Sequence, residues 1–173
     1  MNRRDTLLAL LALGLAPSVS FGQQAKQARR IGYLSSSSSE RDRRYLAVFQ
    51  NRLRELGYAE GKDVVIDERY AEGRFENLPG LVAELISLKA GILLVAGAPA
   101  AHAAKKATNT IPIVMTNDSD PVGDGIVSSL ARPGGNITGL STLAPELNGK
   151  RLEILREVVP KLSRVAVLRT STN

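Results

Sequence analysis

Short apolar runs alternate along this chain with stretches in which apolar residues recur every three or four positions. One such stretch holds Leu46, Phe49, Leu53 and Leu56 at spacings of 3, 4 and 3, the stripe of an amphipathic helix. The pattern predicts strands over residues 31–34, 63–70, 92–96, 111–116, 137–140 and 164–168. It predicts helices between them, over residues 46–56, 78–88, 99–108, 122–130 and 146–159.

Regular alternation of strands and helices is typical of a parallel sheet. The run from Ile92 to Ala96 is apolar throughout, as expected of a strand that helices cover on both faces. The predicted fold class is therefore α/β, with a doubly wound parallel sheet.

The first 22 residues have a different pattern from the rest. Arg3 and Arg4 precede an apolar run, residues 7–16, which is too short to span about 30 Å of hydrocarbon as a helix. Two small residues, Ser20 and Gly22, then stand three positions and one position before Gln23, which is the arrangement typical of a signal-peptide cleavage site. We predict a cleavable signal peptide over residues 1–22, exported by the Sec or the Tat route to the periplasm. The alternative is a buried amino-terminal helix.

Composition narrows the chemistry that the chain can perform. Its 173 residues include 23 Lys and Arg against 17 Asp and Glu, and the basic residues are scattered along helix faces. Without a basic stripe, an exported protein is not expected to bind nucleic acid. The chain has no cysteine, one histidine (His102) and neither of the glycine-rich nucleotide-binding motifs. We therefore expect no catalytic residues, no metal site and no cofactor.

Ligands of open α/β sheets bind outside the carboxyl ends of the strands, where the strand order reverses. The loops at those ends are residues 35–39, 70–75, 97–100, 116–121 and 141–145. Small residues from Gly97 to Ala100 would let a ligand carboxylate reach backbone N–H groups at a helix start, and Asp118 or Asp120 would accept an ammonium. Alternatively, the small residues only form a tight turn, and Asp120 caps the following helix.

Several segments resemble one protein family. They are residues 30–34, 53–64, 71–75, 110–114, 120–123, 130–141 and 149–152, of which the stretch Leu-Ala-Arg-Pro-Gly-Gly-Asn (130–136) is the most specific. These segments make the chain similar to the substrate-binding proteins of ABC transporters for tryptophan- and tyrosine-type uptake. The resemblance extends from about residue 30 to residue 168.

The resemblance implies a type I periplasmic binding protein, whose two lobes close around a small solute, here an amino acid. The solute would pass to a membrane permease driven by a separate ATPase. Tyr70 or Phe75 is the candidate for stacking on an aromatic solute. With the contacts implied by the resemblance, the candidate ligand-binding residues are Ser35, Ser36, Tyr70, Gly97, Ala98, Pro99, Ala100, Asn117, Asp118, Asp120, Pro121 and Ser141.

Members of the resembled family are nearly twice as long as this chain. We therefore expect residues 30–145 to form the first ligand-binding lobe. Residues 146–173 would form a helix that crosses the hinge and the first strand of a truncated second lobe. The alternative function is a periplasmic ligand-sensing subunit that feeds a membrane signalling protein, and an enzyme is not expected.

Overall fold

The computed structural model describes residues 28–142 and 144–166, so the predicted signal peptide lies outside the described residues. Helices and strands follow one another along the chain, and η2 is a single 3-10 turn. Their bounds are β1 (Arg29–Ser35), α2 (Ser39–Glu55), β2 (Val64–Tyr70), η2 (Phe75–Asn77), α3 (Leu78–Ser87), β3 (Ile92–Ala96), α4 (Ala98–Ala107), β4 (Ile113–Asn117), β5 (Ile137–Gly139) and α5 (Ala144–Val158).

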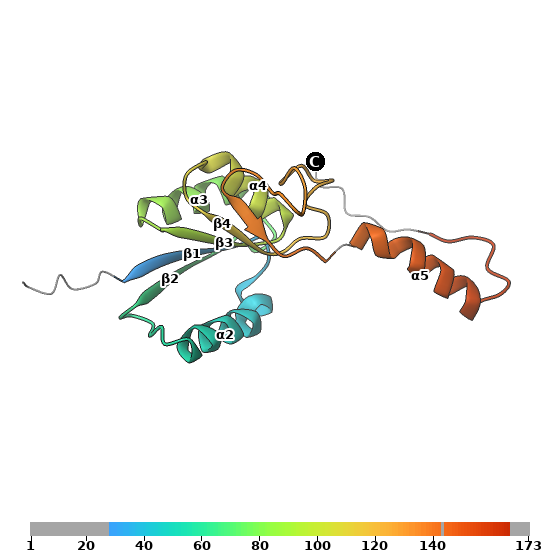
Figure 1. Cartoon of the computed structure of the whole chain (residues 1–173), viewed down its shortest axis with the longest axis horizontal. Coiled ribbons are helices and arrows are strands. Elements are labelled where there is room, and N and C mark those ends of the chain that lie inside the picture. Colours follow the sequence, from blue (N-terminus) through green and yellow to red (C-terminus); the bar gives the residue numbers. More distant parts are fainter. Residues whose placement is uncertain (1–27, 143, 167–173) are drawn as a thin grey trace, which may run out of the picture.

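The five strands form one sheet in the order β2-β1-β3-β4-β5, and every neighbouring pair is parallel. Helices α3 and α4 cover one face of this sheet and α2 lies on the other (Figure 1). The predicted doubly wound parallel sheet is therefore confirmed. The strand order reverses between β1 and β3, which are neighbours in space but not in sequence.

Two apolar clusters hold the layers together, one on each face of the sheet. Because successive side chains of a strand point to opposite faces, Leu93 and Val95 of β3 pack into the cluster with α3 and α4. Leu94 packs instead into the cluster beneath α2, beside Tyr33 and Leu46. Burial on both faces explains why β3 is apolar at every position.

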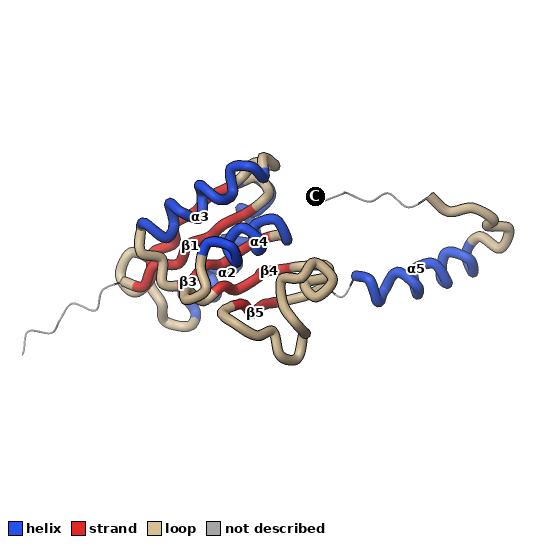
Figure 2. The backbone as a smooth tube through the Cα atoms, turned by 90° about the horizontal axis from the view of Figure 1, so that it is seen from above, coloured by secondary structure: helices blue, strands red, loops and turns tan. Residues whose placement is uncertain are grey.

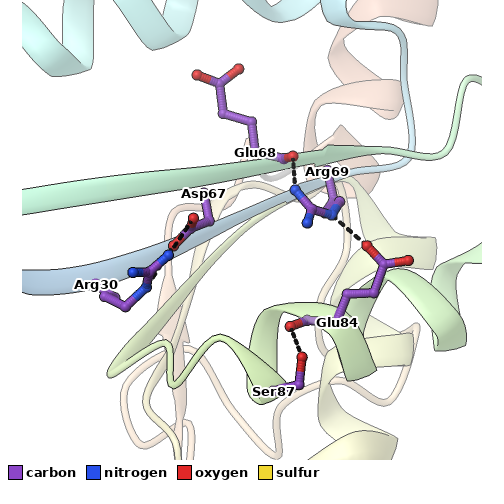
Figure 3. A network of polar contacts seen from close by, with 6 residues as sticks. All are labelled: Arg30, Asp67, Glu68, Arg69, Glu84 and Ser87. Carbon is purple, nitrogen blue, oxygen red and sulfur yellow. Dashed lines mark hydrogen bonds and ion pairs between the residues drawn. The ribbon is translucent and has the colours of Figure 1, made fainter.

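Charged side chains tie the edge strand β2 to its neighbours (Figure 3). Arg30 of β1 donates two hydrogen bonds to the Asp67 carboxylate, at 2.7 and 3.0 Å. Arg69 of β2 donates from Nε to Glu84 of α3 at 2.6 Å and from Nη1 to the Glu68 carbonyl. Charges on an edge strand also discourage pairing with another chain.

The helix predicted over residues 122–130 is wrong. These residues form turns, in which the N–H groups of Ile126 and Val127 both donate to the Pro121 carbonyl. Gly125 has a φ of 68°, a left-handed conformation that no helix contains. The turns still bury Ile126 and Val127 against the α3 and α4 side of the sheet, so these two apolar residues belong to the core without a helix.

Of the sixth predicted strand, residues 164–166 have irregular backbone and residues 167 and 168 lie outside the described residues. Helix α5, close to its predicted bounds, lies apart from the sheet in both views (Figures 1 and 2). Its large apolar side chains are exposed, namely Leu147, Leu152, Ile154, Leu155 and Val158. Within the described ranges, no helix combines the length and the apolar character needed to cross a membrane.

Candidate functional site

The site begins where the strand order reverses, between the carboxyl ends of β1 and β3. The backbone N–H and the Oγ of Ser36 both donate to the Ala96 carbonyl, each at 3.2 Å. Gly97 follows with a φ of 91° and a ψ of 149° and begins α4. A Cβ at this position would run into Oγ of Ser36, so only glycine lets the two loops come this close.

The serine loop after β1 is joined to the loop after β2 by three backbone hydrogen bonds. The N–H groups of Ala71, Glu72 and Gly73 donate to the carbonyls of residues 35, 37 and 36, at 2.9, 3.1 and 3.2 Å. Within the serine loop, Oγ of Ser35 accepts from the N–H of residue 37 at 2.9 Å, and Ser38 caps α2. The two loops therefore form one continuous rim at this edge of the sheet.

A depression of about 370 Å3 opens along this rim. It is lined by Ser36, Ser37, Ser38, Arg41, Glu72, Gly73 and Phe75. Glu72 has a left-handed backbone, with a φ of 52°, and its Oε1 accepts from the N–H of Ser39 at 3.2 Å. Phe75 is 45% exposed. The depression thus combines hydroxyl groups, both signs of charge and an aromatic ring.

Asp118 lies at the carboxyl end of β4 and is only 4% exposed. Its Oδ1 accepts from the N–H of Asp120 at 3.0 Å, whereas Oδ2 is buried without a hydrogen-bond partner among the described residues. Burial raises the pKa of Asp118 above its ordinary value, and the charge of Asp124 adds to this effect. The N–H of Asp120 and the charge of His102 act in the opposite direction.

We expect Asp118→Asn to stabilise the ligand-free chain at neutral pH. The folded carboxyl group holds its proton more tightly than the unfolded one, so its contribution to stability is present at low pH. That contribution is lost as pH rises from about 3.9 through the higher folded pKa. The asparagine variant does not titrate and should gain on the order of 1 kcal/mol at pH 7.

Urea unfolding at pH 4 and pH 7 measures this difference, with the exposed Glu76→Gln as the matched control. The advantage of the Asp118 variant should shrink toward pH 4. A variant less stable than the wild-type chain at pH 7 would show that Oδ2 has a stabilising partner.

A second cavity, of about 240 Å3, lies beside the edge strand β5. Most of its lining is apolar, and it is formed by Met115, Pro121, Val127, Leu130, Pro133, Gly139, Leu140 and Ser141. It brings together two of the predicted ligand-binding residues, Pro121 and Ser141. In the described part of the chain, no three His, Asp or Glu side chains are placed to hold a metal ion.

The structure separates the predicted ligand-binding residues into groups. Ser36 and Gly97 meet at the reversal point, whereas Ser35 and Ala100 are fully buried. Ala98 and Pro99 are half-buried at the start of α4, and Asn117 is exposed at the end of β4.

Asp120 has the capping geometry that was the alternative to ligand binding. Its Oδ1 accepts from the N–H of Gly123 at 2.8 Å and closes a turn rather than a helix. Tyr70 packs edge-on against Tyr33 on the α2 side of the sheet, and its hydroxyl donates to Glu68 at 2.6 Å. Burial and this bond raise the pKa of Tyr70. Of the two stacking candidates, Phe75 rather than Tyr70 lines the depression.

Ser37, Ser38, Arg41, Glu72 and Gly73 line the depression but were not among the predicted residues. The loops 35–39 and 70–75 were both recognised as strand ends. The missing signal was that β1 and β2 are adjacent and parallel, which places these two loops side by side. Arg41 was interpreted only as one of the scattered basic residues on helix faces.

Comparison with known proteins identifies the family. A family model described as ABC transporter substrate binding protein matches residues 37–173. The chain belongs to this family. A tyrosine-binding protein of Clostridioides difficile (strain R20291) is 33% identical to this substrate-binding chain over 120 residues, which make up 69% of the chain and 34% of that protein.

Solved structures of similar proteins show the same fold. A conserved domain protein from Vibrio cholerae superposes with a TM-score of 0.70 at 29% identity, covering 78% of this chain and 45% of that protein. An ABC domain from Streptococcus pneumoniae in complex with L-Trp has a TM-score of 0.61 at 30% identity. The match covers 66% of this chain and 38% of that protein. The substrate-binding chain thus spans less than half the length of these relatives.

Proposed function

We propose that this chain is the periplasmic solute-binding component of an ABC-type uptake transporter and that its solute is an amino acid. The observation that carries the proposal is a polar depression, of about 370 Å3, at the strand ends of a chain that belongs to the substrate-binding family. Relatives named for tyrosine binding and for an L-Trp complex support an amino acid as the solute.

Ligand contacts in this proposal come from the loops at the carboxyl edge of the sheet. They comprise Ser36 and the newly found lining of the depression, together with those other predicted residues that are not buried. Residues 30–145 form the first lobe and residues 146–173 lead into the second. Bound solute passes to a membrane permease that a separate ATPase drives, and the chain itself catalyses no reaction.

Export by residues 1–22 places the protein in the periplasm in this proposal. Amino-terminal sequencing of the protein recovered from the periplasm tests it, because cleavage of the proposed signal leaves Gln23 as the first residue. A chain found only in the cytoplasm with its first 22 residues intact contradicts the location.

Fluorescence of the ligand provides a direct test of binding. The chain contains no tryptophan, so all indole fluorescence in a mixture with L-tryptophan comes from the ligand. Titrating the 173-residue chain into a fixed concentration of L-tryptophan should raise the fluorescence anisotropy to a plateau. L-tyrosine should compete with this signal, and glucose at the same concentration should not. Unchanged anisotropy at millimolar protein, together with no calorimetric signal from the other amino acids, would disprove the amino-acid function.

A further inference from the structure

Two opposite charges line the depression without pairing with each other. Arg41 and Glu72 belong to the same lining, yet neither forms an ion pair with any residue that the structure describes. Oppositely charged side chains on one small surface normally gain by approaching each other. Because no ion pair joins them, the two charges remain as complementary positions for a ligand that carries both charges.

Local hydrogen bonds fix the backbone of Arg41 and both the backbone and the side chain of Glu72. The N–H of Arg41 donates to Oγ of the capping Ser38, which places Arg41 in the first turn of α2. Two hydrogen bonds hold Glu72: its N–H donates to the Ser37 carbonyl, and its Oε1 accepts from the N–H of Ser39. The carboxylate of Glu72 thus already occupies the position at the start of α2 that favours a negative charge. The positive charge that remains for a ligand carboxylate is that of Arg41.

Phe75 supplies an apolar surface beside these charges. Its ring is 45% exposed and belongs to neither of the two apolar clusters that hold the sheet and helices together. An exposed ring next to a charged pair is suited to an aromatic or large apolar side chain, which would pack on it as ligand and depression lose water.

We propose that Arg41, Glu72 and Phe75 form a zwitterion site that selects an aromatic α-amino acid. Arg41 binds the ligand carboxylate, Glu72 binds the ligand ammonium and Phe75 contacts the ligand ring. The site rests on the proposed function and deepens it, because it assigns each chemical group of the solute to one side chain. Both charges of the ligand are recognised within this depression.

Three indole compounds separate these contacts by fluorescence anisotropy. L-tryptophan carries both charges, tryptamine lacks the carboxylate and indole-3-propionate lacks the ammonium. The wild-type chain should bind L-tryptophan more tightly than either analogue. Arg41→Gln should lower the affinity for L-tryptophan and for indole-3-propionate about tenfold or more and leave the affinity for tryptamine unchanged. Glu72→Gln should lower the affinity for L-tryptophan and for tryptamine to a similar degree and leave the affinity for indole-3-propionate unchanged.

Phe75→Leu should weaken all three compounds, since each presents the same ring. Arg43→Gln and Glu76→Gln are matched controls, because both residues are exposed, lie close in sequence and are not in the lining. The Glu72→Gln variant keeps an oxygen for the N–H of Ser39, so its fold is retained, which urea unfolding checks.

A crossed pattern of losses supports the site. The site would be overturned if each charge variant lost the same affinity for all three compounds. It would also be overturned if the control variants lost as much affinity as Arg41→Gln and Glu72→Gln. If the wild-type chain binds L-tryptophan and neither charge variant alters its affinity, the zwitterion site is wrong and the amino-acid function stands. If the wild-type chain binds no amino acid, both are wrong.

Discussion

Replacing Leu93 by alanine is expected to lower the free energy of unfolding by about 2–5 kcal/mol, the largest change that we predict for this chain. Leu93 is 0% exposed and lies in β3, between β1 and β4. The substitution removes buried methyl groups and leaves a cavity that helices on one face and strands on either side cannot easily fill. Urea unfolding followed by circular dichroism measures the loss.

Two further variants test the packing argument. Leu140 is 69% exposed, so Leu140→Ala should change stability by no more than about 0.5 kcal/mol. Gly32 faces the same site, since a Cβ there would lie 2.9 Å from Cδ2 of Leu93. Gly32→Ala should therefore cost less in the Leu93→Ala background than alone. Additive losses, or a loss below about 1 kcal/mol for Leu93→Ala, would contradict tight packing around this side chain.

Gly97→Ala is expected to destabilise the chain by about 1–3 kcal/mol and to weaken solute binding as well. Its φ of 91° and ψ of 149° belong to a region that only glycine adopts readily. The added Cβ would also displace the Ser36 hydroxyl, which donates to the Ala96 carbonyl and lines the depression. Urea unfolding and the L-tryptophan anisotropy titration measure the two effects separately.

The backbone and contact contributions at Gly97 can be separated. Gly57 also has a positive φ, 88°, but a Cβ there meets nothing within 4 Å, so Gly57→Ala reports the cost of a positive φ without a clash. Removing the Ser36 hydroxyl in a Ser36→Ala/Gly97→Ala double variant should recover part of the stability lost in Gly97→Ala. If Gly97→Ala keeps both its stability and its affinity, the close approach of these loops is not needed.

Local patterns predicted the first five strands and four of the five helices correctly, because the apolar pattern of each element follows from its own burial. The continuous apolar run at β3 follows from burial on two faces, and the stripe of α2 from burial on one. The same reasoning failed over residues 122–130, where Ile126 and Val127 are buried by turns rather than by a helix. Apolar spacing reports burial, and Gly123 and Gly125 permitted a non-helical backbone to achieve it.

The amino-acid sequence by itself determined the fold class, because strand and helix periods and the doubly buried run at β3 are local consequences of burial. Only the tertiary structure decided which strand ends form the depression. Ser39 and Glu72 are 33 positions apart, yet a hydrogen bond joins them because β1 and β2 are parallel neighbours. No local pattern encodes strand order, so the charges of Arg41 and Glu72 meet around one depression only after the sheet has formed.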